Sequence, residues 1–271
     1  MDSVRTVSQG SALPRLEAHM LWQQVLNVPR AWLIAHDTDP LAPASVAAFR
    51  KLAQRRIAGE PMAYIVGHRE FMGHEFRVSP DVLIPRPETE LLVEIGLHSI
   101  ENVQAPRVLD LGTGSGAIAV SIALARPDAV VVATDYSGAA LDVARLNAHH
   151  LGAKVEFLLG NWYDALSAHK GFHVIVSNPP YIAAGDGHLR QGDVRFEPAA
   201  ALTDGADGLS ALQRIIQEAG QWLVRHGALF VEHGWDQGHE VRQRLRQAGF
   251  AQVASSPDLA GIDRVTGGIY N

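Results

Sequence analysis

Apolar residues recur at two different spacings along the chain, and the change of spacing divides it into regions. In the first sixty residues, leucine and tryptophan recur at helical spacing in "ALPRLEAHMLWQQVLN", "PRAWLIAH" and "PASVAAFRKLAQRRIAGE". We therefore predict a small helical domain over residues 1–60. Residues 61–86 switch to short alternating runs broken by Gly and Pro, which favours a β-hairpin linker.

Strand-like and helix-like runs alternate over residues 87–271. This alternation predicts an α/β domain built on a doubly wound, mostly parallel sheet. In such a sheet the fourth strand lies beside the first, so the carboxyl ends of these two strands face one ligand-binding crevice. The predicted strands are residues 107–112, 129–135, 154–160, 172–178, 227–234, 250–256 and 264–270.

A glycine-rich turn follows the first of these strands. Gly112, Gly114 and Gly116 are spaced G-x-G-x-G, and a helix is predicted directly after them. Such a turn lets the backbone approach a ligand, although a tight strand-to-helix turn also uses glycine without any ligand. Asp135 ends the next predicted strand, where a carboxylate can accept both hydroxyls of a ribose. The turn and the acid together predict a cofactor that contains a nucleoside.

The fourth predicted strand runs into "SNPPYI". Neither Pro179 nor Pro180 has the N–H that a sheet requires, so the strand ends at Asn178, which the following proline holds extended. The Asn178 side-chain oxygen and the Pro179 carbonyl then form a rigid pair of acceptors beside Tyr181. On these six residues alone, a turn that only terminates the strand explains the sequence equally well.

A planar NH₂ group, in a carboxamide or on a base, would suit this pair of acceptors. The acceptors can bind its two in-plane hydrogens and direct the nitrogen lone pair at an electrophile, while Tyr181 packs against the planar group. No phosphate-binding lysine or metal set accompanies the glycine turn. The electrophile that fits is therefore the sulfonium methyl group of S-adenosylmethionine.

The amino-acid composition excludes several kinds of chemical site and of binding partner. The 271 residues include no cysteine, which excludes disulfides, thiolate metal sites and cysteine nucleophiles. The 13 histidines do not form a metal-binding pattern, and no metal is expected. No apolar run approaches the roughly 20 residues of a membrane span, and the polar start "MDSVRTVSQG" leaves a cytoplasmic enzyme as the expectation. The net charge of −6 argues against a surface that binds nucleic acid over its whole extent.

The glycine turn, the acid after it and "SNPPYI" resemble class I methyltransferases that modify planar nitrogens. Beyond these motifs, four stretches resemble the peptide chain release factor glutamine methyltransferase family: "FMGHEFRVSPDVLIPRPETELLVE", "NWYDAL", "FEPAAALTDGADGL" and "DRVTGGIY". The resemblance implies a helical domain, a hairpin linker and a seven-stranded methyltransferase domain. It also implies a substrate, the glutamine of the Gly-Gly-Gln motif in class 1 release factors, and a monomer with no requirement for nucleic acid or membrane.

The resemblance further implies roles for individual residues. The glycine turn would surround the methionine part of the cofactor, Asp135 would bind its ribose, and Trp162 would lie near its adenine. The residues expected to hold the glutamine amide and serve catalysis are Asn178, Pro179, Pro180 and Tyr181, with Asn178 also touching the cofactor. Arg86, Pro87 and Glu88 would belong to a segment that closes over the site. The expected cofactor-binding residues are Gly112, Thr113, Gly114, Ser115, Gly116, Asp135, Trp162 and Asn178.

Three other functions fit parts of the sequence. A closely related enzyme group methylates a glutamine of a ribosomal protein, and the active-site motifs do not separate the two substrates. An N6-adenine DNA methyltransferase would use a similar pair of acceptors, but it would need a basic channel for a flipped base. A binding module without catalysis would not need an intact "NPPY". One departure from the family pattern is Ile269, where the resemblance leads us to expect arginine in many relatives.

Overall fold

The computed structural model describes residues 1–166 and 169–271. Within these ranges the chain forms two compact units. One consists of residues 1–68 together with 192–196, and the other of residues 69–191 together with 197–271. Each unit has its own core of buried apolar side chains, so each is described separately.

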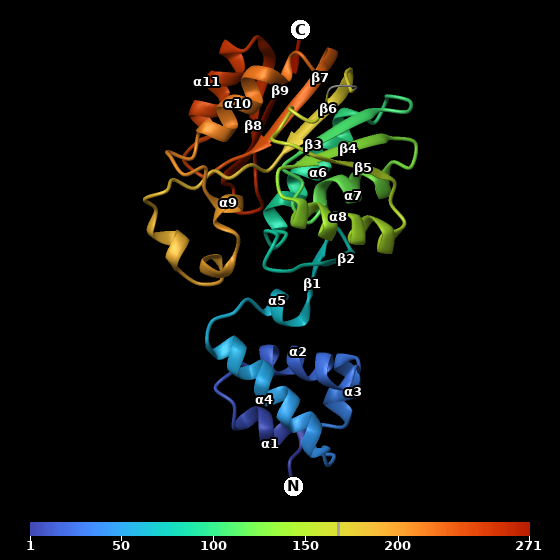
Figure 1. The fold of residues 1–271 in the computed structure, drawn as a ribbon, viewed down its shortest axis with the longest axis vertical. Helices are drawn as coiled ribbons and strands as arrows, with labels where there is room; N and C mark the ends of the chain where they lie inside the picture. Colours follow the sequence, from blue (N-terminus) through green and yellow to red (C-terminus); the bar gives the residue numbers. More distant parts are fainter. Residues whose placement is uncertain (167–168) are drawn as a thin grey trace. The chain divides into compact units, whose positions relative to one another are not determined.

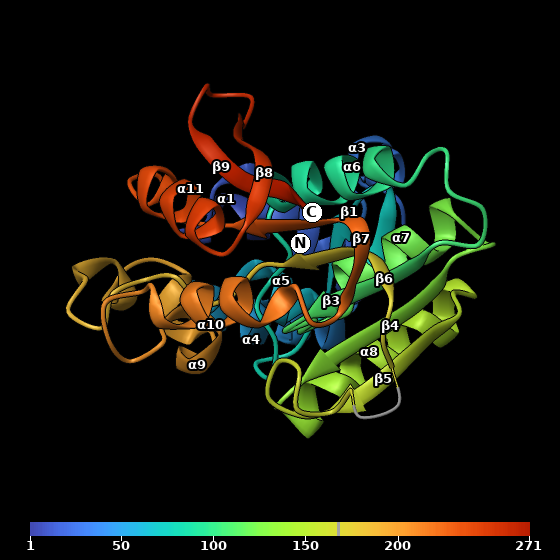
Figure 2. The same ribbon diagram turned by 90° about the horizontal axis from the view of Figure 1, so that it is seen from above.

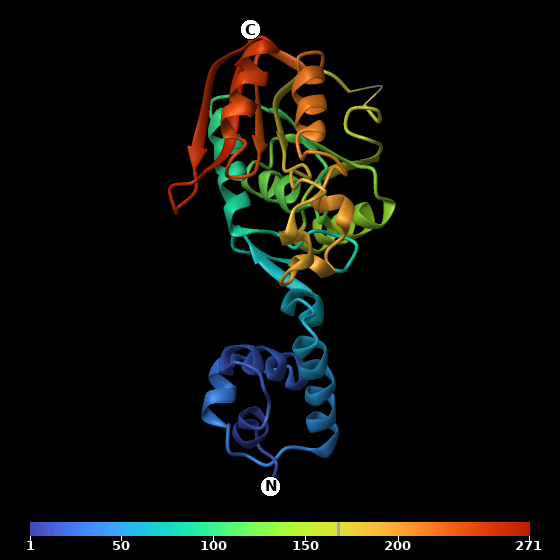
Figure 3. The same cartoon turned by 90° about the vertical axis from the view of Figure 1, so that its left-hand side faces the viewer.

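The first unit is helical, as the spacing of its apolar residues predicts. Its core contains Trp22 and Phe49, whose rings stack at 4.2 Å between centroids and 6° between planes. Figure 3 shows its helices from the side. They are α1 (Val4–Gln9), α2 (Arg15–Leu26), α3 (Arg30–Ala35), α4 (Pro43–Ile57) and α5 (Met62–Val66), and the short η3 (Val194–Phe196) joins the same unit.

Helix α5 differs from the hairpin predicted to begin at residue 61. Pro61 precedes it at the N-cap and Gly67 ends it in the left-handed region, at φ +84°. Three consecutive side chains, those of residues 64–66, are buried, so packing outweighs the strand preference of this β-branched run. The hairpin itself is shorter than predicted, with strands β1 (His68–Phe71) and β2 (His74–Arg77).

Within the second unit, one buried asparagine is hydrogen-bonded to strand β2. The Asn147 side chain accepts a hydrogen bond from the Arg77 N–H at 2.8 Å and donates to the Arg77 carbonyl at 3.0 Å. It also donates to the Ser115 carbonyl at 2.8 Å, within the glycine turn. One side chain therefore connects the hairpin to the turn that lines the candidate site.

The second unit contains a sheet of seven strands in the order β5-β4-β3-β6-β7-β9-β8 (Figure 1). The first five in this order run parallel, and β9 is antiparallel to both of its neighbours. All seven predicted strands are confirmed. They are β3 (Arg107–Leu111), β4 (Val130–Asp135), β5 (Val155–Leu159), β6 (Phe172–Ser177), β7 (Leu223–Glu232), β8 (Phe250–Pro257) and β9 (Asp263–Tyr270).

Helices cover both faces of this sheet and make three layers (Figure 2). Alternate residues of each central strand enter different cores; in β6, Val174 and Val176 face one core and Ile175 the other. On one face lie α6 (Glu90–Ser99), α7 (Ala117–Ala125) and α8 (Gly138–Leu151). On the other lie α10 (Ser210–Ala219) and α11 (Gly238–Gln247). Shorter elements are η1 (Pro87–Thr89), η2 (Gly187–Arg190) and α9 (Ala199–Leu202).

Strands β3 and β6 are hydrogen-bonded neighbours, which confirms the predicted pairing of the first and fourth strands. Leu111 is the register partner of Ser177, so Gly112 and Asn178 follow paired residues at one edge of the sheet. The Ser177 hydroxyl donates to the Leu111 carbonyl at 2.7 Å and fixes the two strand ends together. The order in which successive strands are added to the sheet reverses between these two strands. This switch point is where ligands bind in doubly wound sheets.

Ile269 lies in β9 opposite Ala228 of β7. It is partly buried and packs against the core on the side of α6 and α7. An isoleucine suits this apolar contact, and its position is remote from the carboxyl ends of β3 and β6 because β9 runs antiparallel.

Candidate active site

The glycine turn after β3 has the backbone conformation that its spacing predicts. Gly112, Gly114 and Gly116 all have positive φ, at +73°, +55° and +82°, a region that side chains of L-residues disfavour. The N–H groups of Gly112 and Thr113 both donate to the Thr134 carbonyl, at 2.9 and 3.0 Å, which holds the turn against the end of β4. A Cβ at Gly114 would meet no protein atom within 4 Å, so this glycine leaves free space beside the turn.

Asp135 ends β4 and faces the same turn. Its Oδ2 accepts a hydrogen bond from the Gly114 N–H at 2.9 Å, and its Oδ1 accepts one from the Ser137 N–H at 2.9 Å. Burial raises the pKa of the Asp135 carboxyl, while these backbone donors lower it. The donors fix both oxygens, and each carboxylate oxygen has a further lone pair for a ligand hydroxyl.

Trp162 packs directly on the glycine turn. A Cβ at Gly112 would lie 3.0 Å from the tryptophan ring, so only glycine allows this close approach. The Trp162 carbonyl accepts a hydrogen bond from the Thr134 hydroxyl at 3.0 Å. Trp162 is half-buried and has φ +55°, so the backbone adopts an uncommon conformation to place the ring here.

The Asn178 side chain is hydrogen-bonded only through its nitrogen among the described residues. Its Nδ2 donates to the Thr89 hydroxyl at 3.1 Å, while within the described residues neither its Oδ1 nor the Pro179 carbonyl accepts a hydrogen bond. Thr89 is buried at the end of η1, within the "IPRPETE" segment. The Asn178 Oδ1 and the Pro179 carbonyl, which are the pair expected to hold a substrate amide, thus have no hydrogen-bond partner among the described residues.

Tyr181 has a different environment from its three predecessors. Its hydroxyl donates to Glu232 Oε1 at 3.2 Å, and burial raises the pKa of the phenol above its ordinary value. Its ring packs against the core under α10 and α11. This side chain is therefore anchored in the protein, and it supports the Asn-Pro-Pro turn from behind.

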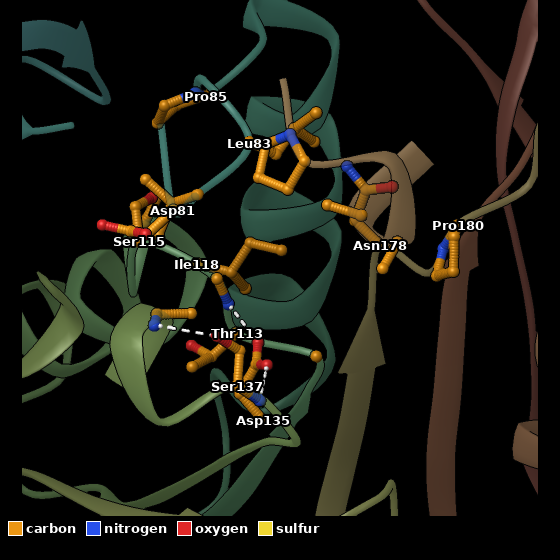
Figure 4. A pocket seen from close by; sticks show the side chains of 18 of the residues that line it. Asp81, Leu83, Pro85, Thr113, Ser115, Ile118, Asp135, Ser137, Asn178 and Pro180 are labelled. Atoms are coloured by element: carbon orange, nitrogen blue, oxygen red, sulfur yellow. Dashed lines mark hydrogen bonds between the residues drawn. The ribbon is translucent and has the colours of Figure 1, made fainter. Parts of the chain in front are cut away.

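One cavity brings most of the predicted residues together. Figure 4 shows Asp135 and Ser137 grouped apart from Asn178 and Pro180, with Ile118 between the two groups in this view. The predicted residues that line the cavity are Gly112, Thr113, Gly114, Ser115, Asp135, Trp162, Asn178 and Pro180. Gly116, Pro179 and Tyr181 are not part of the cavity wall. Gly116 instead begins α7, where a Cβ would come within 3.0 Å of Ala144.

The "PRPETE" segment closes one side of the cavity. Arg86 lines it and forms an ion pair with Glu197, whose side chain is fully buried. Glu197 also accepts a hydrogen bond from the Ile84 N–H at 3.4 Å. The loop before α9 is thereby attached to the segment before α6, and Pro198, Ala200 and Ala201 complete the wall.

Sequence reasoning did not identify three polar residues that shape this site: Thr89, Glu197 and Glu232. Glu197 and Thr89 fall inside stretches that support the family resemblance, but no motif indicated what their side chains contact. Glu232 lies near the end of the predicted strand 227–234, which pairs with the fourth strand, and that position was the available signal. Among the described residues, no group of three or more His, Cys, Asp or Glu side chains could hold a metal ion.

The cavity fits a nucleoside cofactor with a charged chain. Its walls offer a glycine turn, a fixed carboxylate and a half-buried indole, and its far side presents the Asn178 side chain. The fold around it agrees with solved methyltransferases. A methyltransferase from Pyrococcus furiosus superposes with a TM-score of 0.54 at 19% identity, covering 82% of this chain and 95% of the other.

A second solved structure, the 16S rRNA N2 G1207 methyltransferase of T. thermophilus in complex with AdoMet and guanosine, gives a TM-score of 0.57 at 22% identity. It covers 75% of this chain and 50% of the other. Residues 88–205 match the methyltransferase small domain. The fold and site thus define a class I methyltransferase that depends on S-adenosylmethionine.

Residues 5–67 match the PrmC N-terminal domain. The release factor glutamine methyltransferase of Bordetella pertussis is 62% identical over 268 residues, covering 99% of both chains. That of Burkholderia pseudomallei is 53% identical, covering 96% of this chain and 93% of the other. The enzyme of Neisseria gonorrhoeae is 52% identical, covering 96% and 95%. The chain belongs to the release factor glutamine methyltransferase family. In the described residues no helix is both long and apolar enough to span a membrane.

Proposed function

We propose that this protein transfers a methyl group from S-adenosylmethionine to the side-chain amide nitrogen of the glutamine in the Gly-Gly-Gln motif of class 1 release factors. The observation that carries the proposal is the Asn178 side chain, which lines the same cavity as Asp135 and the glycine turn and whose Oδ1 accepts no hydrogen bond within the described residues. The near-complete coverage of relatives that bear this name supports the choice of substrate.

For the cofactor, we propose that the glycine turn surrounds the methionine part and that Asp135 accepts hydrogen bonds from the ribose hydroxyls. Trp162 would pack against the adenine. The free space beside Gly114 and the two backbone donors that fix Asp135 support these roles. When bound, the cofactor supplies an electrophilic methyl group on a positively charged sulfur.

For the substrate, the Asn178 Oδ1 and the Pro179 carbonyl would each accept one N–H of the glutamine amide. Those bonds hold the nitrogen with its lone pair directed at the methyl carbon, at the roughly 3–3.5 Å that such an attack requires. The N–C bond forms as the C–S bond breaks, and its electrons stay on sulfur. The nitrogen then loses one proton to water, so no strong base is required. Pro180 would line the approach and Tyr181 would support the turn.

Two other substrates could receive a methyl group by the same chemistry. A glutamine of a ribosomal protein would bind to the same pair of acceptors, and the site geometry does not discriminate against it. An exocyclic adenine amine would also fit, but the chain carries a net charge of −6, which disfavours the phosphate backbone of DNA. We propose that the enzyme acts as a monomer in the cytoplasm, where release factors work.

The test is methyl transfer from labelled S-adenosylmethionine to a purified class 1 release factor. The matched control is the same factor with Gln→Ala in its Gly-Gly-Gln motif, and ribosomal protein and adenine-containing DNA are assayed in parallel. We expect label on the wild-type factor and none on the control factor. Label only on ribosomal protein or DNA would overturn the substrate and keep the methyltransferase.

A further inference from the structure

Arg86 is the only basic side chain among the described residues that line the cavity, and the acidic ones are Asp81 and Asp135. A guanidinium stays charged at neutral pH, and its charge repels a cationic ligand in the same cavity. The cofactor that the proposed function places here is such a ligand, because its reactive sulfur carries a positive charge. An arginine in this wall therefore calls for a partner that cancels its charge.

Glu197 is that partner. The Arg86 Nη2 donates to the Glu197 Oε1 and forms an ion pair in which the glutamate side chain is 0% exposed and the arginine side chain 31%. The Ile84 N–H donates to the other carboxylate oxygen at 3.4 Å, so contacts from two residues of one segment hold the carboxylate. Because Glu197 is shielded from water, its charge is screened only weakly and acts on Arg86 at close range.

Arg86 lies at the end of the cavity that contains Asn178. It is the N-cap of η1, and its carbonyl accepts a hydrogen bond from the Thr89 N–H at 3.1 Å. The Thr89 hydroxyl in turn accepts from the Asn178 Nδ2 at 3.1 Å. Burial raises the pKa of the Tyr181 phenol, and the charge of Arg86 acts on it in the opposite direction. The charge of Arg86 therefore reaches the turn where the proposed function places methyl transfer.

We propose that Glu197 is a specificity-determining residue that cancels the charge of Arg86, so that the cavity favours the cationic S-adenosylmethionine over its neutral product, S-adenosylhomocysteine. The two ligands share their adenine, ribose, amine and carboxylate groups, and they differ in the methyl group and the charge on sulfur. Glu197 would touch neither ligand and would act through Arg86. The inference rests on the proposed function, which places the sulfur at this end of the cavity.

The charge of Glu197 has a consequence for each turnover. Methyl transfer removes the positive charge from sulfur, so a cavity wall whose arginine is neutralised binds the cofactor more strongly relative to the product. Without Glu197, the uncompensated Arg86 would disfavour the cofactor and leave the neutral product unaffected. For unit charges on the order of 10 Å apart in a partly buried site, this difference corresponds to about 3- to 10-fold in relative affinity.

The experiment measures the affinities of both ligands by isothermal titration calorimetry for the wild type, Glu197→Gln, and Glu197→Gln combined with Arg86→Gln. Glutamine keeps the size of the side chain and an acceptor for the Ile84 N–H. Glu197→Gln should lower the ratio of S-adenosylmethionine to S-adenosylhomocysteine affinity about 3- to 10-fold. The double variant removes both charges and should restore this ratio to within about twofold of wild type. A purely structural role would change both affinities alike and would not be rescued by a second substitution.

Two control variants separate charge from shape. Asp128→Asn removes the acid of an ion pair with Arg126 outside the cavity, and it should leave the affinity ratio unchanged. Gly112→Ala disturbs the cavity without changing its charge, so it should weaken both ligands by the same factor. In turnover, S-adenosylhomocysteine should inhibit Glu197→Gln more strongly, relative to the KM for S-adenosylmethionine, by the same factor by which the affinity ratio falls.

The outcomes separate the two proposals. If the wild type binds the cofactor and methylates the release factor, but Glu197→Gln keeps the wild-type affinity ratio, the role of Glu197 is wrong and the proposed function stands. The same holds if the double variant keeps the lowered ratio of the single variant, because the effect then does not come from the charge of Arg86. If the wild type binds neither ligand, the proposed function fails, and the inference falls with it.

Discussion

The backbone N–H of Gly114 donates to the carboxylate of Asp135 at 2.9 Å, so the acid expected to bind the ribose also fixes the glycine turn that lies beside it. The bond joins two loops that follow neighbouring strands, β3 and β4. A ligand that contacts both would therefore meet one rigid surface. Loss of the carboxylate would remove a ligand group and loosen the turn together.

Asp135→Ala should weaken binding of S-adenosylmethionine about 10- to 100-fold, because a hydrogen bond to a charged group contributes about 1.5–3 kcal/mol. Isothermal titration calorimetry would measure this affinity. Asp128→Ala is a suitable control, since Asp128 pairs with Arg126 outside the cavity. An affinity equal to that of the wild type would show that Asp135 does not bind the cofactor.

Asn178→Ala should lower kcat about 100-fold or more, because the loss of one group that hydrogen-bonds to the transition state lowers kcat by about this factor. The side chain provides one of the two free acceptors, and its loss leaves the glutamine amide held by the Pro179 carbonyl alone. Cofactor affinity should fall less than tenfold. Single-turnover methyl transfer and calorimetry would separate the two effects, with the exposed Asn102→Ala as control. Turnover at the wild-type rate would refute the acceptor mechanism.

The sheet was predictable because its strands are short apolar runs closed by Gly, Pro or Asp. The pairing of β3 with β6 follows from the strand order of a doubly wound sheet, and it places Gly112 near Asn178. Helix α5 was not predictable in this way. Its apolar run suits a strand, whereas Pro61 at the N-cap, Gly67 at the C-cap and the burial of residues 64–66 accompany a helix.

The support behind the site could not be derived from spacing. Asn178 and Thr89 come from separate segments, and their contact depends on how the η1 turn packs against the end of β6. The anchoring of Tyr181 to Glu232 was missed for the same reason, because "NPPY" does not indicate which way the phenol points. The sequence of residues 192–196 likewise does not indicate that this segment belongs to the helical unit.

A comparison of two glycines with nearly equal φ distinguishes the effect of backbone strain from the effect of the close contact at the site. Gly112 has φ +73° and Gly152, the C-cap of α8, has φ +75°. A Cβ at Gly112 would lie 3.0 Å from the Trp162 ring, but one at Gly152 would meet nothing within 4 Å. Gly152→Ala should therefore cost only about 1–2 kcal/mol of unfolding free energy and leave cofactor affinity unchanged.

Gly112→Ala should cost at least as much stability and also weaken cofactor binding about tenfold or more, because the added methyl group displaces Trp162. Denaturant unfolding and calorimetry on both variants would measure the two effects. Equal cofactor affinity in the two variants would show that the contact between Gly112 and Trp162 does not shape the site.

Asp110 should make the protein less stable as the pH rises. Complete burial raises the pKa of this carboxyl from 3.8 to about 7, opposed in part by Thr113 and Ala119. Between these two values the folded protein binds a proton that the unfolded chain has released, so stability is lost as the pH increases toward 7. Asp110→Asn cannot ionise and should escape this loss.

The difference in unfolding free energy between Asp110→Asn and the wild type should therefore increase by about 2–3 kcal/mol from pH 5 to pH 8 in favour of the variant, at about 1.4 kcal/mol per pKa unit. Comparing the two proteins at each pH cancels the contribution of Glu232, which titrates in the same range. Urea unfolding without cofactor would measure the difference. Asp128→Asn serves as control, because the pKa of Asp128 lies at about 2 and its charge is constant over this range. A difference that is independent of pH would mean that Asp110 is ionised throughout, and that its buried charge is stabilised by the hydrogen bonds from Thr113 and Ala119 alone.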